Sequence, residues 1–215
     1  MKTGRSIFVS ALIAVAPWLS VLAVKAADDG IAAAKVGAPA PEFDATDVQG
    51  HERRLSDFKG KYVVLEWHNQ GCPYVGKHYN SGNMQHLQKE LTGQGVVWLT
   101  VISSAPGKQG YVTPDEEDKY LHEKQASPTA VLLDPDGKLG RLYGAKTTPD
   151  MYLIDEKGVL VYSGAIDDKP THDVADIEGA KNYVLAAYHE VKAGKPVSVA
   201  ITAPYGCSVK YKDLN

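Results

Sequence analysis

Residues 61–79 read KYVVLEWHNQGCPYVGKHY and combine a strand, a loop and the start of a helix around one cysteine. The apolar run over 61–67 follows a glycine and precedes polar residues, which predicts a short buried strand. Gly71 breaks the chain, and Pro73 suits the first turn of a helix, where its missing N–H is not needed. The stretch therefore places Cys72 between the end of a strand and the beginning of a helix.

The residues that follow predict one long helix that begins at Pro73 and ends at Gly93 and Gly95. Its apolar face consists of Val75, Tyr79, Leu87 and Leu91. Residues 96–102, VVWLTVI, predict a second buried strand. Strand, helix and strand in this order predict a right-handed parallel crossover.

Further elements are expected on both sides of this crossover. Before it come an extended arm over 35–42 and a hairpin over 43–55 with its turn at Gln49-Gly50. After it, a capping box at Thr113–Glu116 begins a helix that ends near Gln125. The remaining expected elements are a strand over 129–133, a turn over 134–137, a hairpin formed by 151–155 and 159–163, and a last helix with Ala180, Tyr183, Val184, Ala187 and Val191 on one face. The alternation indicates an α/β fold.

Composition and charge exclude several classes of protein. The 215 residues are 44% hydrophobic and 23% charged, which is typical of one ordered domain with extensions. The 23 basic and 26 acidic residues give a net charge of −3, which does not favour a nucleic-acid partner. The two cysteines exclude a disulfide-dense scaffold and a four-cysteine metal site.

The first 26 residues have the layout of a secretory signal peptide. Lys2 and Arg5 precede an apolar run over 7–24, and small residues follow it, with cleavage expected after Ala26. An uncleaved membrane anchor is the alternative, although Pro17 and Ser20 interrupt the run. We expect an exported protein, periplasmic or secreted and free of the membrane after cleavage, in a compartment where a disulfide persists.

Four features together resemble the thioredoxin fold, over residues 36–193. They are Cys72-Pro73 at a strand–helix junction, Thr148-Pro149 just before a strand, the segment YLIDEKGVLVYSGAID over 152–167, and the order of the elements. The resemblance implies a central mixed sheet flanked by helices, with an N-terminal hairpin. It also implies that Pro149 is cis beside the reactive cysteine and that the Thr148 backbone contacts bound thiols and peptides. Residues 27–35 are then a linker, and residues 194–215 form a C-terminal tail that carries Cys207.

Four further strings sharpen the resemblance. WHNQGCPYVGKHY, SGNMQHLQ, SSAPGKQGY and TAPYGCSVKY are similar to the peroxiredoxin-like branch of the redoxin (AhpC/TSA) group. In that branch a single cysteine, here Cys72, stands at the first position of the CxxC motif. Val75 occupies the second position, so the chain lacks both the thioredoxin dithiol and the usual peroxidatic position. The surrounding residues also depart from peroxiredoxins, with Asn69 three residues before Cys72 and Arg141 in the context GRLYG.

The chemistry of Cys72 follows from its position. A thiol is a nucleophile only as the thiolate, and the unpaired N–H groups at a helix N-terminus favour that form. Lys77, His68 and His78 are close in sequence and are expected to add positive potential. The alternative is an inert, buried cysteine that packs as a small hydrophobe.

Cys207, 135 residues further on, is the candidate resolving partner if the tail folds back over the reactive loop. The Cys72 thiolate would attack a protein or small-molecule disulfide, or be oxidised by a peroxide to a sulfenic acid. Cys207 would then resolve the intermediate, and an external thiol reductant would reset the pair without a cofactor. Pro73, Tyr74, Val75, Thr148 and Pro149 are the expected substrate-binding residues. Trp67 is expected to pack behind the loop.

Two rival interpretations remain open. The first is a metal site, copper above all, formed by His68, Cys72 and His78, as in thioredoxin-like copper chaperones. Against it, His78 lies more than one helical turn from Cys72, where histidines are usually exposed.

The second rival interpretation is a non-catalytic binding module with a permanent Cys72–Cys207 disulfide, which contacts a partner through the SSAPGKQGY loop or the acidic run 115–118. That run equally suits a helix N-terminus. The remaining histidines interpreted as surface residues are His86, His122, His172 and His189.

Overall fold

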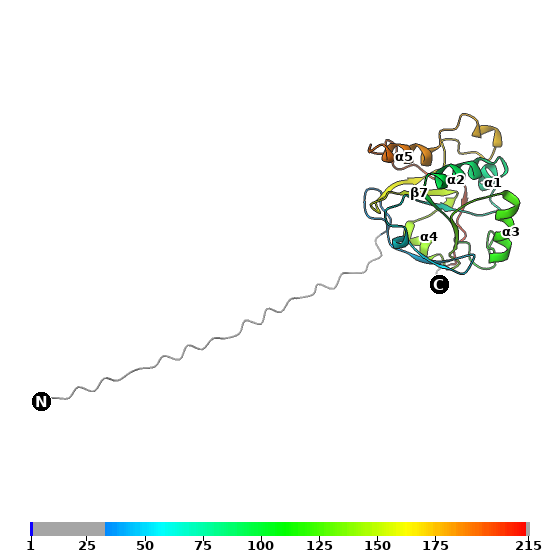
Figure 1. The fold of residues 1–215 in the computed structure, drawn as a ribbon. Coiled ribbons are helices and arrows are strands. Elements are labelled where there is room, and N and C mark those ends of the chain that lie inside the picture. Colours follow the sequence, from blue (N-terminus) through cyan, green and yellow to red (C-terminus); the bar gives the residue numbers. More distant parts are fainter. Residues whose placement is uncertain (2–32, 214–215) are drawn as a thin grey trace. The chain divides into compact units, whose positions relative to one another are not determined.

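The computed structural model of the protein describes Met1 and residues 33–213 (Figure 1). The expected signal peptide over 1–26 and most of the expected linker lie outside the described residues. Within the part of the chain that the structure describes, no helix has the length and apolar character needed to cross a membrane.

A seven-stranded mixed sheet forms the centre of the fold. Its strands are, in spatial order, β2 (Glu52–Arg54), β1 (Asp44–Asp47), β5 (Ala130–Leu133), β4 (Val97–Ile102), β3 (Val63–Trp67), β7 (Asp150–Ile154) and β8 (Leu160–Gly164). β3, β4 and β5 are parallel, and the other pairs are antiparallel. The parallel crossover and both expected hairpins are therefore confirmed. The order of elements is that of a thioredoxin-like fold.

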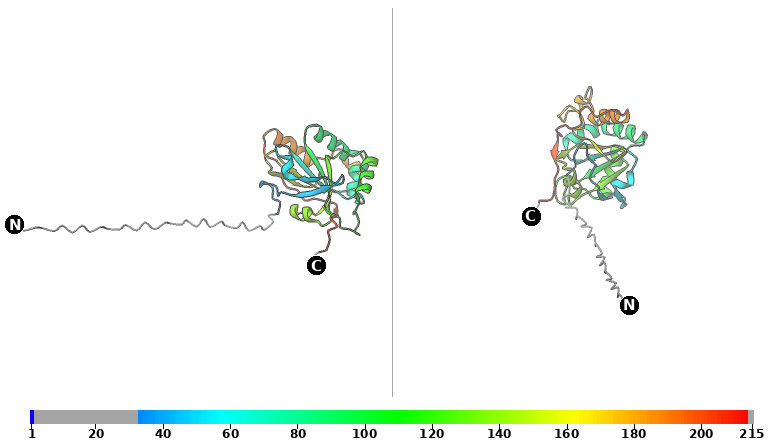
Figure 2. Two further views of the ribbon diagram at one scale, coloured as in Figure 1. Left: turned by 60° about the horizontal axis from the view of Figure 1, so that its bottom comes forward. Right: turned by 90° about the vertical axis from the view of Figure 1, so that its left-hand side faces the viewer.

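Helices cover both faces of the sheet. They are α1 (Pro73–Asn80), α2 (Asn83–Gly93), α3 (Pro114–Lys124), α4 (Lys138–Tyr143) and α5 (Tyr183–Lys192). Residues of α1, α2 and α5 pack with Val64, Trp98 and Leu153 on one face, and α4 packs with Leu65 and Leu99 on the other. Figures 1 and 2 show α1, α2 and α5 together, opposite α4. The central strands β3, β4 and β7 are buried along their whole length, because each places one apolar set against each helical layer.

The single helix expected from Pro73 to Gly93 is wrong, because the chain forms two helices. The break is at Ser81-Gly82, where Gly82 has a φ of 78° and precedes α2. The Ser81 hydroxyl donates to the main-chain oxygen of Lys77 at 2.7 Å and so closes the end of α1. Both helices pack on the same sheet face. All four apolar residues of the expected stripe are therefore buried: Val75, Tyr79, Leu87 and Leu91.

The turn expected over 134–137 is followed by α4, a helix that is not expected from the sequence. The Asp134 carboxylate accepts hydrogen bonds from the N–H groups of Leu139 and Gly140, at 3.1 and 2.8 Å, and holds the first turn. Six residues are too few to display a helical period. The last helix begins at Tyr183 rather than Ala180, because the Asn182 side chain caps it by accepting from the Leu185 N–H.

The capping box at Thr113 is confirmed. The Thr113 N–H donates to Glu116 Oε2 at 2.7 Å, and the Glu116 N–H donates to Thr113 Oγ1 at 3.4 Å. Three residues of the acidic run 115–118, Asp115, Glu116 and Glu117, thus lie in the first turn of α3, where carboxylates complement the helix dipole.

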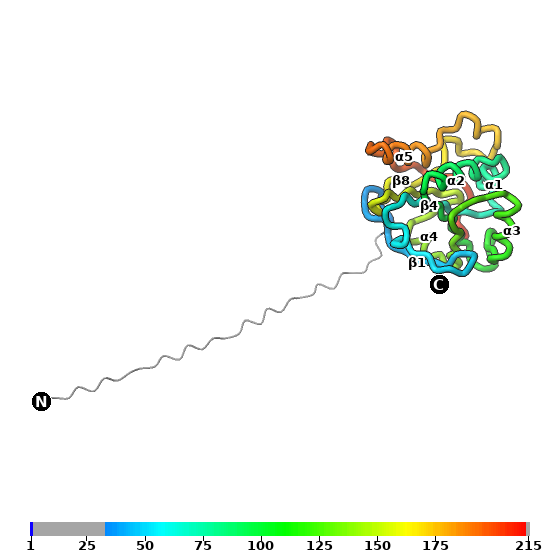
Figure 3. Tube along the Cα trace, in the orientation of Figure 1, coloured from blue at the N-terminus to red at the C-terminus, as the bar shows by residue number. Residues whose placement is uncertain are grey.

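The C-terminal tail runs back across the sheet after α5. Ile201 bridges to Ser163 of β8, and the short strand β9 (Cys207–Ser208) pairs antiparallel with β6 (Thr147–Thr148). Figure 3 follows the tail, coloured red, from α5 past the middle of the domain toward the C-terminus. The tail therefore reaches the loops at the carboxyl end of β3.

Candidate active site

Cys72 lies where the sequence predicts it, between β3 and α1. It is the residue that precedes the first turn of α1, has an extended backbone and is followed by Pro73 at the first helical position. Its side chain is 1% exposed. The thiol donates a hydrogen bond to the main-chain oxygen of Thr148 at 3.1 Å. The Thr148–Pro149 peptide is cis, as the resemblance implied.

The tail brings Cys207 to the same place. In the β6–β9 pair, Cys207 is the register partner of Thr148, and Ser208 is the partner of Thr147. Cys207 is half-buried, and both cysteines are free thiols. Four of the seven candidate site residues thus meet at one corner: Cys72, Cys207, Thr148 and Pro149.

The two thiols have opposite pKa shifts. Burial acts to raise the pKa of Cys72, but hydrogen bonds from the side chains of Cys207 and Thr148 and from the Val75 N–H outweigh it and leave this pKa below its ordinary value. Burial raises the pKa of Cys207, and its hydrogen bond to Cys72 raises it further, to about 11. Cys72 is therefore the thiol that ionises first, and Cys207 donates a hydrogen bond to the resulting thiolate.

A glycine permits this close approach of the tail. Gly206 has a φ of +137°, and a Cβ at this position would lie 2.1 Å from the Thr148 main-chain oxygen. No larger residue fits between Tyr205 and Cys207 without displacing the tail from β6. Cys207 stands out in the sequence as the remaining cysteine, whereas nothing there distinguishes Gly206.

The loop before Cys72 is fixed by Asn69. Its Nδ2 donates to Gln109 Oε1 at 2.8 Å, and its Oδ1 accepts from the Gly71 N–H at 2.9 Å. The SSAPGKQGY loop, which carries Gln109, is thereby tied to the residue before the reactive cysteine. In the sequence Asn69 stands out only as a departure from the peroxiredoxin pattern, because nothing there indicates that Gln109, forty residues further on, lies beside it.

Trp67 packs behind the loop, as expected. Its side chain is fully buried, and its Nε1–H donates to Ser103 Oγ at 3.0 Å. Ser103 in turn donates to Asp134 Oδ2 at 2.6 Å.

The residues of the expected docking surface are not equally accessible. Pro73 is exposed, but the side chain of Val75 is fully buried, so that its main-chain N–H is the group that faces Cys72. Tyr74 is half-buried and lies edge-on to the rings of Tyr205 and His172, at centroid distances of 5.9 and 5.7 Å. The tail thus covers Tyr74 as well as Cys72.

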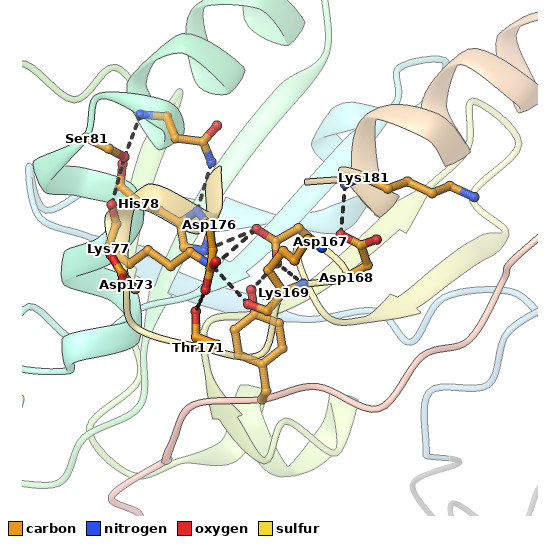
Figure 4. Close-up of polar contacts among 12 residues, drawn as sticks. Lys77, His78, Ser81, Asp167, Asp168, Lys169, Thr171, Asp173, Asp176 and Lys181 are labelled. Atoms are coloured by element: carbon orange, nitrogen blue, oxygen red, sulfur yellow. Dashed lines mark hydrogen bonds and ion pairs between the residues drawn. The ribbon is translucent and has the colours of Figure 1, made fainter. Parts of the chain in front are cut away.

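The expected positive potential from His78 is wrong, and so is its expected exposure. Burial is the main reason that its pKa is lowered to about 4, so the imidazole is neutral near pH 7. Figure 4 shows Lys77 and His78 pointing toward Asp167, from the segment that follows β8. The Lys77 ammonium donates to the Lys169 main-chain oxygen at 2.8 Å and lies 3.7 Å from Asp167 Oδ2. These side chains are buried because that segment folds over α1.

His68 faces a different cluster on the sheet. Its Nδ1 lies 3.6 Å from Glu66 Oε1, and both side chains are buried. Glu66 also accepts from the Tyr79 hydroxyl and the Trp98 indole, each at 2.8 Å. Within residues 33–213 no three His, Cys, Asp or Glu side chains are arranged to hold a metal ion, so His68, Cys72 and His78 do not form the rival site. The four other histidines named above are exposed, as expected.

Two proteins with similar sequences are named as a thiol-disulfide oxidoreductase and a peroxiredoxin. The thiol-disulfide oxidoreductase ResA of Geobacillus kaustophilus is 30% identical over 131 residues, which are 55% of this chain and 75% of ResA. Peroxiredoxin-2 of Bos taurus is 32% identical over 145 residues, which are 59% of this chain and 67% of that protein.

A solved structure extends the similarity over most of the chain. The crystal structure of an uncharacterized conserved protein from Geobacillus kaustophilus has a TM-score of 0.73 and 26% identity, and the match covers 84% of this chain and 94% of that one. The family model of the AhpC/TSA family matches residues 36–163, more than half of the chain. The chain therefore belongs to the AhpC/TSA family.

Proposed function

We propose that this protein is a thiol–disulfide redox protein in which Cys72 is the nucleophile and Cys207 the resolving cysteine. The observation that carries the proposal is the β6–β9 pairing, which sets Cys207 opposite Thr148, the residue whose main-chain oxygen accepts the hydrogen bond of the Cys72 thiol. The lowered pKa of Cys72 and the raised pKa of Cys207 agree with these two roles. A nucleophile needs the thiolate, whereas a resolving thiol is useful while it stays protonated until the first step is complete.

The relatives support the same class of chemistry. ResA is named a thiol-disulfide oxidoreductase, and the relative from Bos taurus is named peroxiredoxin-2. We place the chain in the peroxiredoxin-like branch that has a single cysteine at the first CxxC position. Val75 at the second position is buried, and the tail supplies the second thiol instead.

The proposed cycle consists of two thiol–disulfide exchange reactions. The Cys72 thiolate attacks one sulfur of a substrate disulfide, so that a Cys72–substrate disulfide forms and the other substrate sulfur leaves as a thiolate. Cys207 then loses its proton and attacks Cys72 Sγ, which forms the Cys72–Cys207 disulfide and releases the second substrate thiol. The substrate is reduced and the protein is oxidised by two electrons. An external dithiol reductant returns the pair to the thiol form.

The substrate contacts follow from the corner. Pro73, Tyr74 and the main chain of Val75 border Cys72 on the helix side, and Thr148 and Pro149 border it on the sheet side. We further propose that the protein works after export, periplasmic or secreted, on the basis of residues 1–26. An oxidising compartment would supply disulfide substrates.

Reduction of a peroxide is the second candidate. Cys72 is 1% exposed, which favours a small substrate over a large one. The thiolate would attack one peroxide oxygen and become a sulfenic acid while the other oxygen leaves as an alcohol or water. Cys207 would then form the disulfide and release water. Labelling of Cys207→Ser with dimedone after treatment with hydrogen peroxide would detect the sulfenic acid, and its absence would exclude this candidate.

A small disulfide tests the proposal directly. With hydroxyethyl disulfide and a dithiol reductant, the wild type should accelerate reduction, and Cys72→Ser should lose that acceleration. Cys207→Ser should accumulate a mixed disulfide at Cys72, visible by mass spectrometry. Full activity of Cys72→Ser would overturn the assignment.

A further inference from the structure

The segment between β8 and α5 carries a buried carboxylate close to the candidate active site. Asp167 is 3% exposed, and its main chain forms a bridge with Asn182, the residue that caps α5. Next to this bridge, the Tyr183 N–H donates to the Ile166 oxygen at 2.9 Å. The two ends of the segment over 168–181 are therefore tied together, and Asp167 has a fixed place at its base.

Side chains of α1 face one oxygen of this carboxylate. Lys77 Nζ lies 3.7 Å from Asp167 Oδ2, while its hydrogen bond goes to the Lys169 main-chain oxygen at 2.8 Å. His78 Nε2 lies 3.9 Å from the same Oδ2, and the Asn83 amide donates to His78 Nδ1 at 2.8 Å, so the ring proton is on Nε2. Figure 4 shows these contacts converging on Asp167. Both distances to Oδ2 exceed the length of a hydrogen bond.

The other oxygen of the carboxylate accepts from the C-terminal tail. The Tyr205 hydroxyl donates to Asp167 Oδ1, and the Lys169 N–H donates to the same atom at 2.9 Å. The Tyr205 ring also lies 5.8 Å from the Lys77 ammonium and 5.9 Å from the ring of Tyr74. Tyr205 is therefore the side chain that hydrogen-bonds directly to Asp167, and its ring rests against α1.

These contacts connect the two elements that carry the cysteines. Tyr74 and Lys77 lie on α1, two and five residues after Cys72. Tyr205 stands two residues before Cys207 in the tail. Two residues of extended chain span at most about 7 Å. A Tyr205 that is fixed against α1 therefore confines Cys207 to the neighbourhood of Cys72.

The strand pair by itself is a weak attachment for Cys207. β9 pairs with β6 over two residues in each strand, and an isolated two-stranded pair is marginally stable. After the pair, the Tyr211 hydroxyl donates to the Ala145 oxygen at 2.8 Å. Before the pair, the side-chain attachment nearest to Cys207 is the hydrogen bond from Tyr205 to Asp167. Loss of this bond therefore loosens the tail on the side that leads back to α5.

We propose that Asp167 is a positioning residue for the disulfide-forming step, because it binds the Tyr205 hydroxyl and so holds Cys207 opposite Thr148 for reaction with Cys72. This inference rests on the proposed function and adds a residue to it. In the step, the Cys207 and Cys72 sulfurs form a bond and the substrate thiolate leaves, as in the cycle above. Asp167 takes part in neither event. It raises the effective concentration of one thiol at the other, since the tail is ordered before the reaction.

The equilibrium between the dithiol and the disulfide form of the protein tests this role. The protein and its variants are equilibrated with mixtures of reduced and oxidised glutathione, acid-quenched, alkylated and read by mass spectrometry. An equilibrium constant does not depend on how a reagent reaches the buried Cys72. Tyr205→Phe keeps the buried Lys77–Asp167 pair and removes only the hydroxyl. It should lower the constant for disulfide formation about ten-fold, as expected for one hydrogen bond to a charged group, which raises the reduction potential by about 30 mV.

A neighbouring carboxylate provides the matched control. Asp168 is exposed and accepts from the Lys181 N–H at 2.9 Å, within the same segment. Asp168→Asn makes the same change of charge and should leave the constant within about two-fold of the wild-type value. Asp167→Asn should lower the constant in the wild type but have less than about a two-fold effect in Tyr205→Phe, since both substitutions weaken one contact. Additive effects, or an unchanged constant in Tyr205→Phe, would overturn the positioning role.

Titration of the Cys72 thiol gives an independent readout. The Cys207 side chain lowers the pKa of Cys72 by a hydrogen bond, so a loosened tail in Tyr205→Phe should raise that pKa. A contact that served stability alone would lower the urea midpoint and leave both this pKa and the glutathione equilibrium unchanged, which would contradict the proposal. If the wild type formed no Cys72–Cys207 disulfide at any glutathione ratio, the proposed function itself would be wrong.

Discussion

Thr148 and Cys207 are register partners in the two-stranded β6–β9 sheet, and the main-chain oxygen of Thr148 accepts the hydrogen bond of the Cys72 thiol. One residue therefore touches both cysteines. The tail is brought to the reactive loop by strand pairing rather than by the two thiols alone. The pairing thus holds Cys207 beside the residue that the Cys72 thiol contacts.

The contact between the thiols should be visible in the titration of Cys72. Cys207→Ala removes the side-chain hydrogen bond that lowers the pKa of Cys72, so this pKa should rise. Cys207→Ser keeps a hydroxyl donor and should raise it less. Thiolate absorbance measured against pH gives both values. An unchanged pKa in Cys207→Ala would show that the two side chains are not in contact.

Gly206→Ala should displace the tail. The new Cβ would meet the Thr148 oxygen, and the backbone there has a positive φ, so we expect a loss of about 1–3 kcal/mol of stability. Formation of the Cys72–Cys207 disulfide should slow. Gly194→Ala is the matched control, since its φ is +70° but the space around it is open, and it should cost only about 1 kcal/mol and leave the disulfide rate unchanged. Equal disulfide rates in both variants would contradict the close packing of Gly206.

His78 should make the fold sensitive to mild acid. Its folded pKa of about 4 lies below the ordinary value of 6.5, because burial disfavours the charged form. Between pH 6.5 and pH 4, His78 is protonated in the unfolded chain but neutral in the folded chain. The free energy of unfolding therefore falls as the pH drops from 6.5 toward 4. The loss should approach about 3 kcal/mol. Urea unfolding of the wild type and His78→Gln at several pH values measures it, and parallel pH profiles would refute this account.

Ionisation of Asp150 should destabilise the fold as the pH rises, which is the reverse of the effect of His78. Burial raises its pKa to about 7, from an ordinary value of 3.8. The folded chain holds a proton that the unfolded chain has lost between these two values, so this contribution to stability disappears as the pH rises from 3.8 to 7. Asp150→Asn keeps an acceptor for the Lys146 N–H and should unfold at higher urea concentration than the wild type at pH 8. A lower midpoint would mean that the ionised carboxylate is needed to hold β6.

Much of the fold follows from local sequence. Short apolar runs such as 61–67 and 96–102 predict the central strands, because strands buried on both faces need continuous apolar residues. Pro73 and the Thr113 capping box place helix starts correctly. The break at Gly82 is missed because a single glycine is tolerated within a helical pattern, and the apolar face continues on its far side.

The candidate site is only partly visible in the sequence. Cys72 and the Thr148–Pro149 pair stand out through their neighbours, and Cys207 stands out as the remaining cysteine. The pairing of β9 with β6 has no sequence signal, since two-residue strands show no periodicity. His78 is buried because the segment that carries Asp167 packs over it. That segment lies about ninety residues further along the chain, and the helix pattern around His78 does not predict this long-range contact.

A free-thiol count on the protein after expression in an oxidising compartment tests the central claim most directly. The protein is alkylated before any reductant is added, and again after mild reduction, and both samples are read by mass spectrometry with peptide mapping. The account predicts no free thiol at first, a single Cys72–Cys207 disulfide, and two free thiols after mild reduction. Two free thiols in the untreated protein, or a disulfide that mild reductant leaves intact, would contradict a redox cycle between Cys72 and Cys207.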